Sequence, residues 1–136
     1  IDRIIAVAPE VVSHNLETVR RLTREVRIQA KYDRSLEVLA YLKVQGLPRT
    51  KSGIMLGLGE TSTEVIESMK DLHAANVDII TIGQYLQPSK NHLPVKEFIT
   101  PEQFKKYEIL GLEMGFRHVE SGALVRSSYK AQKHLL

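Results

Sequence analysis

The 136-residue sequence predicts an α/β fold made of parallel βα units. Short apolar runs alternate along the sequence with segments of helical spacing, and this alternation favours parallel strands joined by crossover helices. Only three or four such units are present, whereas a closed barrel of this kind takes about 250 residues. We therefore expect either a small open sheet or part of a larger barrel.

The first half of the sequence contains three predicted strands and two helical segments. Apolar runs at residues 4–7 and 11–12 predict two short strands, and the second run leads into the sequence "SHNLET". Residues 19–26 keep helical spacing, and a helix is predicted more clearly over 33–45, where a glycine follows its end. The stretch "TKSGIMLGLGET" predicts a strand over 53–58 that meets the next helix at glycines.

The second half repeats the theme of strand, loop and helix. Thr61 and Glu64 form a capping-box pattern, which predicts the start of a helix that runs to about Asn76. Residues 79–82 predict the next strand, and a long polar loop follows it. A proline at the first helical position predicts a helix over 100–115. The sequence "FRHVESG" predicts a last strand.

The composition is that of an ordinary globular protein and excludes several kinds of site. The net charge is +3 and the basic residues lack interleaved aromatics, so no nucleic-acid partner is expected. No apolar run approaches the roughly 20 residues that a membrane helix needs, so no membrane partner is expected either. The sequence has no cysteine, which excludes a disulfide framework, a thiol nucleophile and a thiolate metal site among these residues.

Polar residues follow directly after the predicted strand that leads into "SHNLET". Period-two alternation places Ser13, Asn15 and Glu17 on one face. An amide and a carboxylate two residues apart suit the hydroxyl groups of a sugar, because the carboxylate accepts hydrogen bonds and the amide both donates and accepts them. An ordinary exit from strand to loop is the structural alternative.

Two later strands also lose bulk or become polar at their carboxyl ends. Gly57 and Gly59 remove side chains where a ring or phosphate could touch the backbone, and a tight turn that needs positive φ angles is the structural alternative. Gly83 precedes three polar residues in the sequence "TIGQYLQPS". Since open α/β sheets and barrels bind ligands at the carboxyl ends of their strands, the three ends together predict a binding site there.

Five stretches of this sequence occur in the order and spacing of one known family. "HNLETV", "TKSGIMLGLGET", "TIGQYLQPSKNHLPV", "GFRHVESG" and "RSSY" resemble lipoyl synthase, and the resemblance covers essentially all of residues 1–131. The family fold is a partial (β/α)6 TIM-like barrel. The resemblance implies that residues 1–120 form the C-terminal half of that barrel and that residues 121–136 are a tail carrying the "RSSY" motif.

The resemblance also implies a chemistry, cofactors and partners. Lipoyl synthases insert two sulfur atoms, at C6 and C8, into an octanoyl chain on a lipoyl carrier domain or a glycine-cleavage H protein. They use S-adenosyl-L-methionine and two 4Fe-4S clusters, one of which is consumed as the sulfur source. A reductant such as flavodoxin or ferredoxin and a cytoplasmic location in bacteria are implied with them. The family's cysteine triads lie upstream of the matched stretches, which implies that this sequence is inactive alone.

Several residues carry over from the family to the cofactor site. Asn15 and Glu17 resemble the positions that face the ribose and methionine parts of the cofactor. Arg27 is the candidate for the cofactor carboxylate, with Lys51 and Ser52 as neighbours. The glycine-rich turn resembles the one against which adenine stacks, and polar residues after the strand at 79–82 should line the cavity. These two groups are Gly57, Leu58, Gly59 and Glu60, and Gln84, Tyr85 and Gln87.

The "RSSY" segment resembles the family's most diagnostic feature, a serine that ligates the auxiliary cluster in place of a fourth cysteine. The ligand here is Ser127 or Ser128, with Arg126 beside it as the candidate catalytic residue. The sequence departs from the usual family pattern at Ser13 and at Lys130. The first departure bears on one cavity-side contact, and the second on how the tail packs.

Two alternatives remain open beside lipoyl synthase. Another radical S-adenosylmethionine sulfurtransferase, of biotin synthase type, has a similar "HNLDT" strand, although "GQYLQP" and "RSSY" favour lipoyl synthase. The absence of cysteine favours a module that binds a nucleotide or a carrier domain without catalysis. If the strand ends do bind a ligand, Asn15, Glu17, Gly57 and Glu60 should converge on one edge of the sheet.

Overall fold

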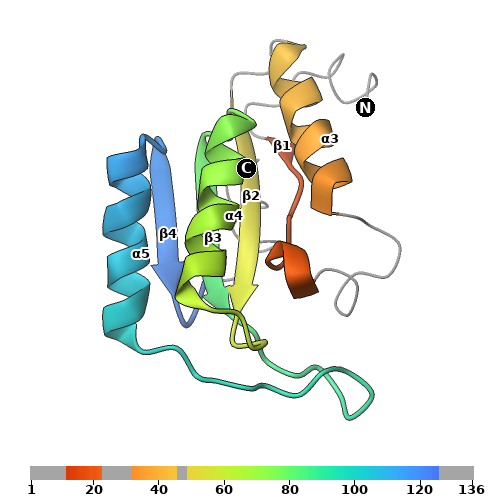
Figure 1. The fold of residues 1–136 in the computed structure, drawn as a ribbon, viewed down its shortest axis with the longest axis vertical. Coiled ribbons are helices and arrows are strands. Elements are labelled where there is room, and N and C mark those ends of the chain that lie inside the picture. The colour runs from red at the N-terminus through yellow and green to blue at the C-terminus, as the bar shows by residue number, and fades with distance from the viewer. Residues whose placement is uncertain (1–11, 23–31, 46–48, 126–136) are drawn as a thin grey trace.

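The computed structural model describes residues 12–22, 32–45 and 49–125, and it confirms the α/β fold with parallel strands (Figure 1). The predicted strand at 4–7 and the candidate residues Arg27, Arg126, Ser127 and Ser128 lie outside the described residues. The elements are β1 (Val12–Ser13), the 3₁₀ helix η1 (Arg20–Leu22), α3 (Tyr32–Val44), β2 (Thr50–Leu56), α4 (Ser62–Ala74), β3 (Ile79–Gln84), α5 (Pro101–Met114) and β4 (His118–Gly122).

The four strands form one parallel sheet in the order β1-β2-β3-β4. All strands therefore present their carboxyl ends at the same edge, which is the lower edge in Figure 1. Within the described residues, β1 lies at one border of the sheet and β4 at the other. A parallel sheet with strands in chain order is the arrangement expected for part of a barrel.

Local sequence signals set the ends of the helices. Thr61 and Glu64 form both hydrogen bonds of the predicted capping box at the start of α4. Thr100 caps α5, whose first residue is the predicted proline, and Gly115 ends it at φ 111°. Strand β2 begins three residues earlier than the predicted strand at 53–58. The prediction missed these three residues because they are polar, although all of them are buried in the structure.

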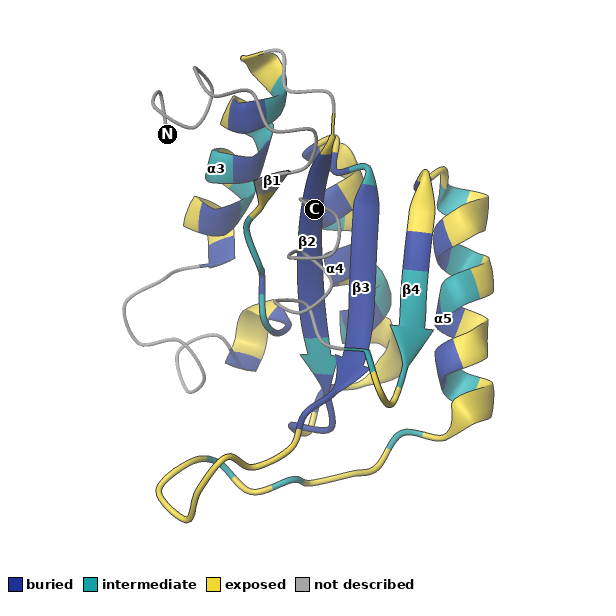
Figure 2. Cartoon of the chain, turned by 180° about the vertical axis from the view of Figure 1, so that it is seen from behind, coloured by how far each residue is buried: buried dark blue, intermediate teal, exposed yellow. Residues whose placement is uncertain are grey.

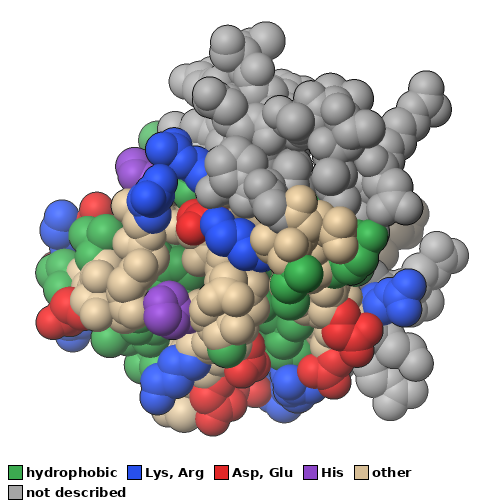
Figure 3. All heavy atoms as spheres, turned by 90° about the horizontal axis from the view of Figure 1, so that it is seen from above, with side chains coloured by type: hydrophobic (Ala, Val, Ile, Leu, Met, Phe, Trp, Pro, Cys, Tyr) green, Lys and Arg blue, Asp and Glu red, His purple; other side chains and the backbone are tan. Residues whose placement is uncertain are grey.

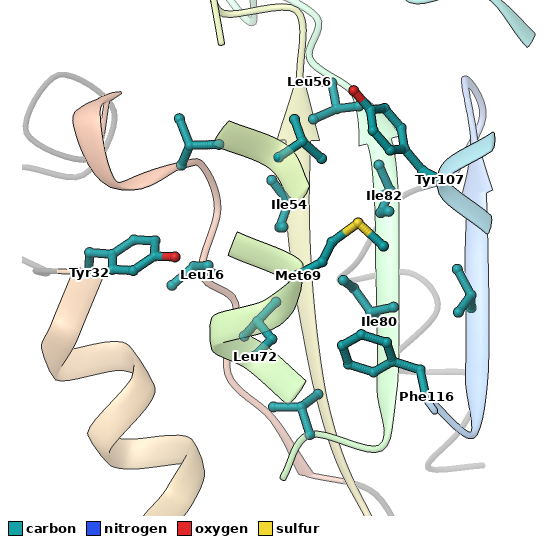
Figure 4. Packing of buried hydrophobic residues seen from close by; sticks show 14 of the residues in the cluster. Leu16, Tyr32, Ile54, Leu56, Met69, Leu72, Ile80, Ile82, Tyr107 and Phe116 are labelled. Carbon is teal, nitrogen blue, oxygen red and sulfur yellow. The ribbon is translucent and has the colours of Figure 1, made fainter. Parts of the chain in front are cut away.

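The core lies between the sheet and the helices on one of its faces (Figure 4). Ile54 of β2 and Ile80 and Ile82 of β3 pack with Met69 of α4, and none of these four side chains is more than 1% exposed. Burying each such side chain contributes about 1.5–3 kcal/mol. Tyr32 attaches α3 to the same layer, because its hydroxyl donates to Asp71 of α4 at 2.6 Å.

The opposite side of the sheet, here named the inner face, has a different composition. Strand register places on it the residues that alternate with the core-facing ones. No helix of the described residues covers this face, which is turned toward the viewer in Figure 2. Lys51 and Thr81 lie on it and are nevertheless fully buried. Its members are Lys51, Gly53 and Met55 of β2, Ile79, Thr81 and Gly83 of β3, and His118, Glu120 and Gly122 of β4.

Candidate binding site at the carboxyl edge of the sheet

The segment after β1 runs beside the end of β2 in an unusual backbone conformation. The Glu17 N–H donates to the Gly53 carbonyl at 2.8 Å, and the Met55 N–H donates to the Glu17 carbonyl at 2.8 Å. Glu17 has φ 79°, a left-handed conformation that costs a residue with a side chain about 1–3 kcal/mol. Glu17 and Asn15 are both half-buried. The fold thus holds Glu17 at the carboxyl edge in a strained conformation.

The next residue adds a second unfavourable feature. The Thr18 side chain is fully buried, and its hydroxyl oxygen has no hydrogen-bond partner within the part of the chain that the structure describes. A buried hydroxyl without a partner costs about 1–3 kcal/mol. Two destabilising features in consecutive residues indicate that this segment is shaped by a requirement other than stability.

The turn between β2 and α4 closes on itself. Gly57 and Gly59 both have φ 104°, so the positive φ angles expected of a tight turn are present. The nearly buried Glu60 carboxylate accepts hydrogen bonds from the Gly57 N–H and the Leu58 N–H, each at 3.0 Å. Glu60 therefore stabilises the turn from within.

Arg21 clamps this turn to the start of α4. Its guanidinium donates to both Glu64 carboxylate oxygens, at 2.8 and 3.0 Å, and to the Gly59 carbonyl at 2.9 Å. The hydrogen bonds from Arg21, followed by that from the Thr61 backbone, lower the pKa of Glu64 to about 2. Arg21 was not among the predicted site residues, because its partners lie about forty positions later in the chain and leave no signal in the local sequence.

The polar residues expected to line a cavity form hydrogen bonds with the loop of residues 86–99. The Gln84 amide donates to the Glu97 carbonyl at 3.0 Å and accepts from the Ile99 N–H at 2.9 Å. The loop is tied in turn to the glycine-rich turn, because the Lys96 N–H donates to the Gly57 carbonyl at 2.7 Å. Two further hydrogen bonds hold the loop in place: the Tyr85 hydroxyl donates to the Leu93 carbonyl, and the Gln87 amide donates to the His92 carbonyl.

Lys51 and Ser52, expected together near a cofactor carboxylate, point to opposite faces of β2. The Ser52 hydroxyl accepts the Leu16 N–H at 3.0 Å on the core side. Lys51 lies on the inner face and is fully buried. The structure brings Glu17, the glycine-rich turn and Glu60 to one edge of the sheet, and separates Ser52 from Lys51.

A hollow of about 260 Å³ lies at the opposite, amino edge of the strands, which Figure 3 views from above. Asp78 in its wall accepts from Lys43 at 2.6 Å and from the Thr50 N–H at 3.0 Å. Helices α4 and α5 end beside it and direct their carbonyl ends there, which disfavours an anion. The lining residues are Lys43, His73, Asn76, Val77, Asp78, Gly115 and Arg117. Because ligands of parallel sheets bind at the carboxyl edge, this hollow is not the candidate site.

Comparisons with known proteins identify relatives across the whole chain. Residues 1–72 match the family model described as the radical SAM superfamily. The chain is 81% identical over 136 residues to the lipoyl synthase of Flavobacterium psychrophilum, covering 100% of this chain and 47% of that protein. It is 77% identical over 135 residues to the mitochondrial lipoyl synthase of Nematostella vectensis, covering 99% of this chain and 46% of that protein.

The relatives confirm the resemblance to lipoyl synthase, and the chain spans about half the length of the curated relatives that it matches. A solved structure, Streptococcus suis SuiB, is similar with a TM-score of 0.62 and 13% sequence identity, covering 82% of this chain and 26% of that one. At this identity the likeness shows the fold alone. Among the described residues, no helix is long and apolar enough to cross a membrane.

Proposed function

This chain belongs to the radical SAM superfamily, and from that premise we propose that it is part of a lipoyl synthase. The proposed reaction inserts two sulfur atoms, at C6 and C8, into an octanoyl chain bound to a lipoyl carrier domain or a glycine-cleavage H protein. The observation that carries the proposal is the 81% identity to a curated lipoyl synthase over all 136 residues. Electrons would come from a reductant such as flavodoxin or ferredoxin.

The residues at the carboxyl edge fit S-adenosyl-L-methionine. Asn15 and Glu17 are half-buried and follow β1, where amide and carboxylate groups can bind ribose hydroxyls and an ammonium group. The strain at Glu17 and the unpartnered hydroxyl of Thr18 support a binding role for this segment. We assign Asn15 and Glu17 to direct contacts with the cofactor, and Arg27 to its carboxylate.

The same residues do not fit an iron–sulfur cluster by themselves. The sequence has no cysteine, so these 136 residues supply no thiolate ligand. Within the proposal, Ser127 or Ser128 is a ligand beside Arg126, and the thiolate ligands come from other residues. Bound S-adenosylmethionine and a cluster would supply radical chemistry for removing hydrogen from the octanoyl chain.

The remaining candidate residues build the rim that carries this site. Arg21 and Glu64 fix the glycine-rich turn, and Gln84 fixes the loop of residues 86–99 against it. A rim that is held by internal hydrogen bonds keeps the binding groups oriented before the cofactor arrives. We propose this supporting role for Gly57, Leu58, Gly59, Glu60, Gln84, Tyr85 and Gln87.

The test uses the full-length protein, reconstituted anaerobically with iron and sulfide and supplied with S-adenosylmethionine, dithionite and an octanoyl-lysyl peptide. Mass spectrometry should detect a peptide that has gained two sulfur atoms. Loss of the charge in Glu17→Gln should weaken S-adenosylmethionine binding roughly ten- to hundredfold. Glu113→Gln, at an exposed position of α5, is the matched control and should bind normally.

Three outcomes would contradict parts of this proposal. Cofactor binding without any sulfur insertion would favour the binding module. Conversion of dethiobiotin in place of the octanoyl peptide would favour an enzyme of biotin synthase type. Equal affinities of Glu17→Gln and Glu113→Gln would remove Glu17 from the site.

A further inference from the structure

Strand β4 ends in a turn that sends the chain back toward its neighbour β3. The Val125 N–H donates to the Gly122 carbonyl at 3.2 Å, which closes a four-residue turn. Leu124 is at the outside of this turn and is 91% exposed. Beyond the turn, the main chain of Val125 lies against Gly83 of β3.

The contact between Gly83 and Val125 leaves no room for a side chain. A Cβ atom at Gly83 would collide with the Val125 carbonyl oxygen and lie 3.3 Å from the carbonyl carbon. The left-handed glycines of the described residues are Gly57, Gly59 and Gly115, so the backbone of Gly83 does not itself demand glycine. Close approach of another main chain is therefore the reason for glycine at this position.

Gly122 provides an internal comparison, because it pairs with Gly83 in the sheet and lies on the same inner face. A Cβ atom at Gly122 would lie 3.9 Å from Cγ2 of Val125, which is an ordinary van der Waals separation. Two neighbouring glycines thus differ in one respect. Only Gly83 has to lack a side chain for Val125 to keep its place.

We propose that Gly83 is a positioning residue that seats the start of the C-terminal segment on the inner face of the sheet. Two peptide units separate Val125 from Ser127, which limits the distance between their Cα atoms to about 7 Å. Seating Val125 on β3 therefore keeps the "RSSY" segment near the face that carries Lys51 and Thr81. The seat itself follows from the contact geometry, and its effect on turnover rests on the proposed function.

Limited trypsin digestion of the full-length protein tests the seat without any cofactor. Cleavage after Arg126 reports release of the segment, and cleavage after the fully buried Lys51 reports opening of the whole sheet. In Gly83→Ala, overpacking should raise cleavage after Arg126 roughly five- to hundredfold, with little change at Lys51. Gly122→Ala should match the parent protein at both sites.

Equal rates of cleavage after Arg126 in Gly83→Ala and the parent would overturn the proposal. A parallel rise at Lys51 would also overturn it, because Gly83 would then stabilise the sheet as a whole. In the reconstituted enzyme, Gly83→Ala should form at least about tenfold less sulfur-containing peptide at unchanged S-adenosylmethionine affinity. An inactive parent protein would refute the proposed function but would leave the digestion result intact.

Discussion

The two edges of the sheet each contain an ion pair and a residue other than glycine in a left-handed conformation, yet they differ in kind. At the amino edge, Asn76 has φ 63° just after α4, where asparagine often ends a helix. At the carboxyl edge, Glu17 has φ 79° and ends no helix. The strain at Asn76 has a routine structural explanation, whereas the strain at Glu17 has none.

If the carboxyl edge binds the cofactor, as we propose, backbone strain indicates the functional edge better than hollow space does. The hollow of about 260 Å³ lies at the amino edge, between the ends of helices and beside the pair of Lys43 and Asp78. The carboxyl edge instead combines Glu17, the unpartnered Thr18 hydroxyl and the clamped turn. Variants at both edges test whether only the strained carboxyl edge affects cofactor binding.

The largest effect is expected from placing a side chain at a left-handed glycine of each edge. Gly115→Ala should lower the free energy of unfolding by about 1–3 kcal/mol, because Gly115 has φ above 100°. Gly57→Ala should lower it further, because a Cβ atom there would also collide with the Gln84 amide and the Glu97 carbonyl oxygen. Only Gly57→Ala should also weaken S-adenosylmethionine binding. Chemical denaturation and calorimetric titration of the full-length variants measure the two effects. Weakened binding in Gly115→Ala would remove the contrast between the edges.

A smaller effect is expected at the amino edge from Asp78→Asn. The carboxylate accepts from Lys43 and from the Thr50 N–H, so its loss should cost about 1–3 kcal/mol of unfolding free energy. Cofactor affinity should not change, since this ion pair lies at the far end of the strands. A reduced affinity in a titration of the folded variant would show that the amino edge takes part in binding.

The smallest effect is a pH dependence at the carboxyl edge. The pKa of Glu64 is about 2 in the folded protein, below its ordinary value of 4.5, so its stabilisation is complete above pH 4.5 and is lost as the pH falls toward 2. Arg21 is half-exposed, which limits the contribution to about 1 kcal/mol or less. The stability difference between the parent and Glu64→Gln, from urea unfolding, should therefore shrink over this range. A constant difference would contradict the assigned pair.

Local signals in the sequence predicted much of the fold. The capping box at Thr61, the proline after Thr100 and Gly115 each act through neighbours in the chain, and helices α4 and α5 begin or end at these residues. The early start of β2 could not be predicted, because its first residues are polar and become buried only in the assembled sheet.

The candidate site was predicted less completely than the fold, because many of its hydrogen bonds join residues that are distant in the chain. The sequence did predict that Glu17 lies beside the end of β2, since parallel strands bring the two together. The hydrogen bonds of Gln84 were not predicted, because its partners are main-chain groups of an irregular loop. Arg21 gave no local signal, because Glu64 and Gly59 are distant in the chain. Contacts between loops depend on tertiary geometry that residue spacing does not reveal.

The agreement between strand order in the sheet and strand order along the chain has a consequence for folding during synthesis. Each new strand can dock on the one made just before it, so the sheet can grow from one border as the chain leaves the ribosome. Gly83 and Gly122 must pair before Val125 has a surface on which to lie. A chain released before residue 125 is therefore expected to form the rim but to lack the main chain that rests on Gly83.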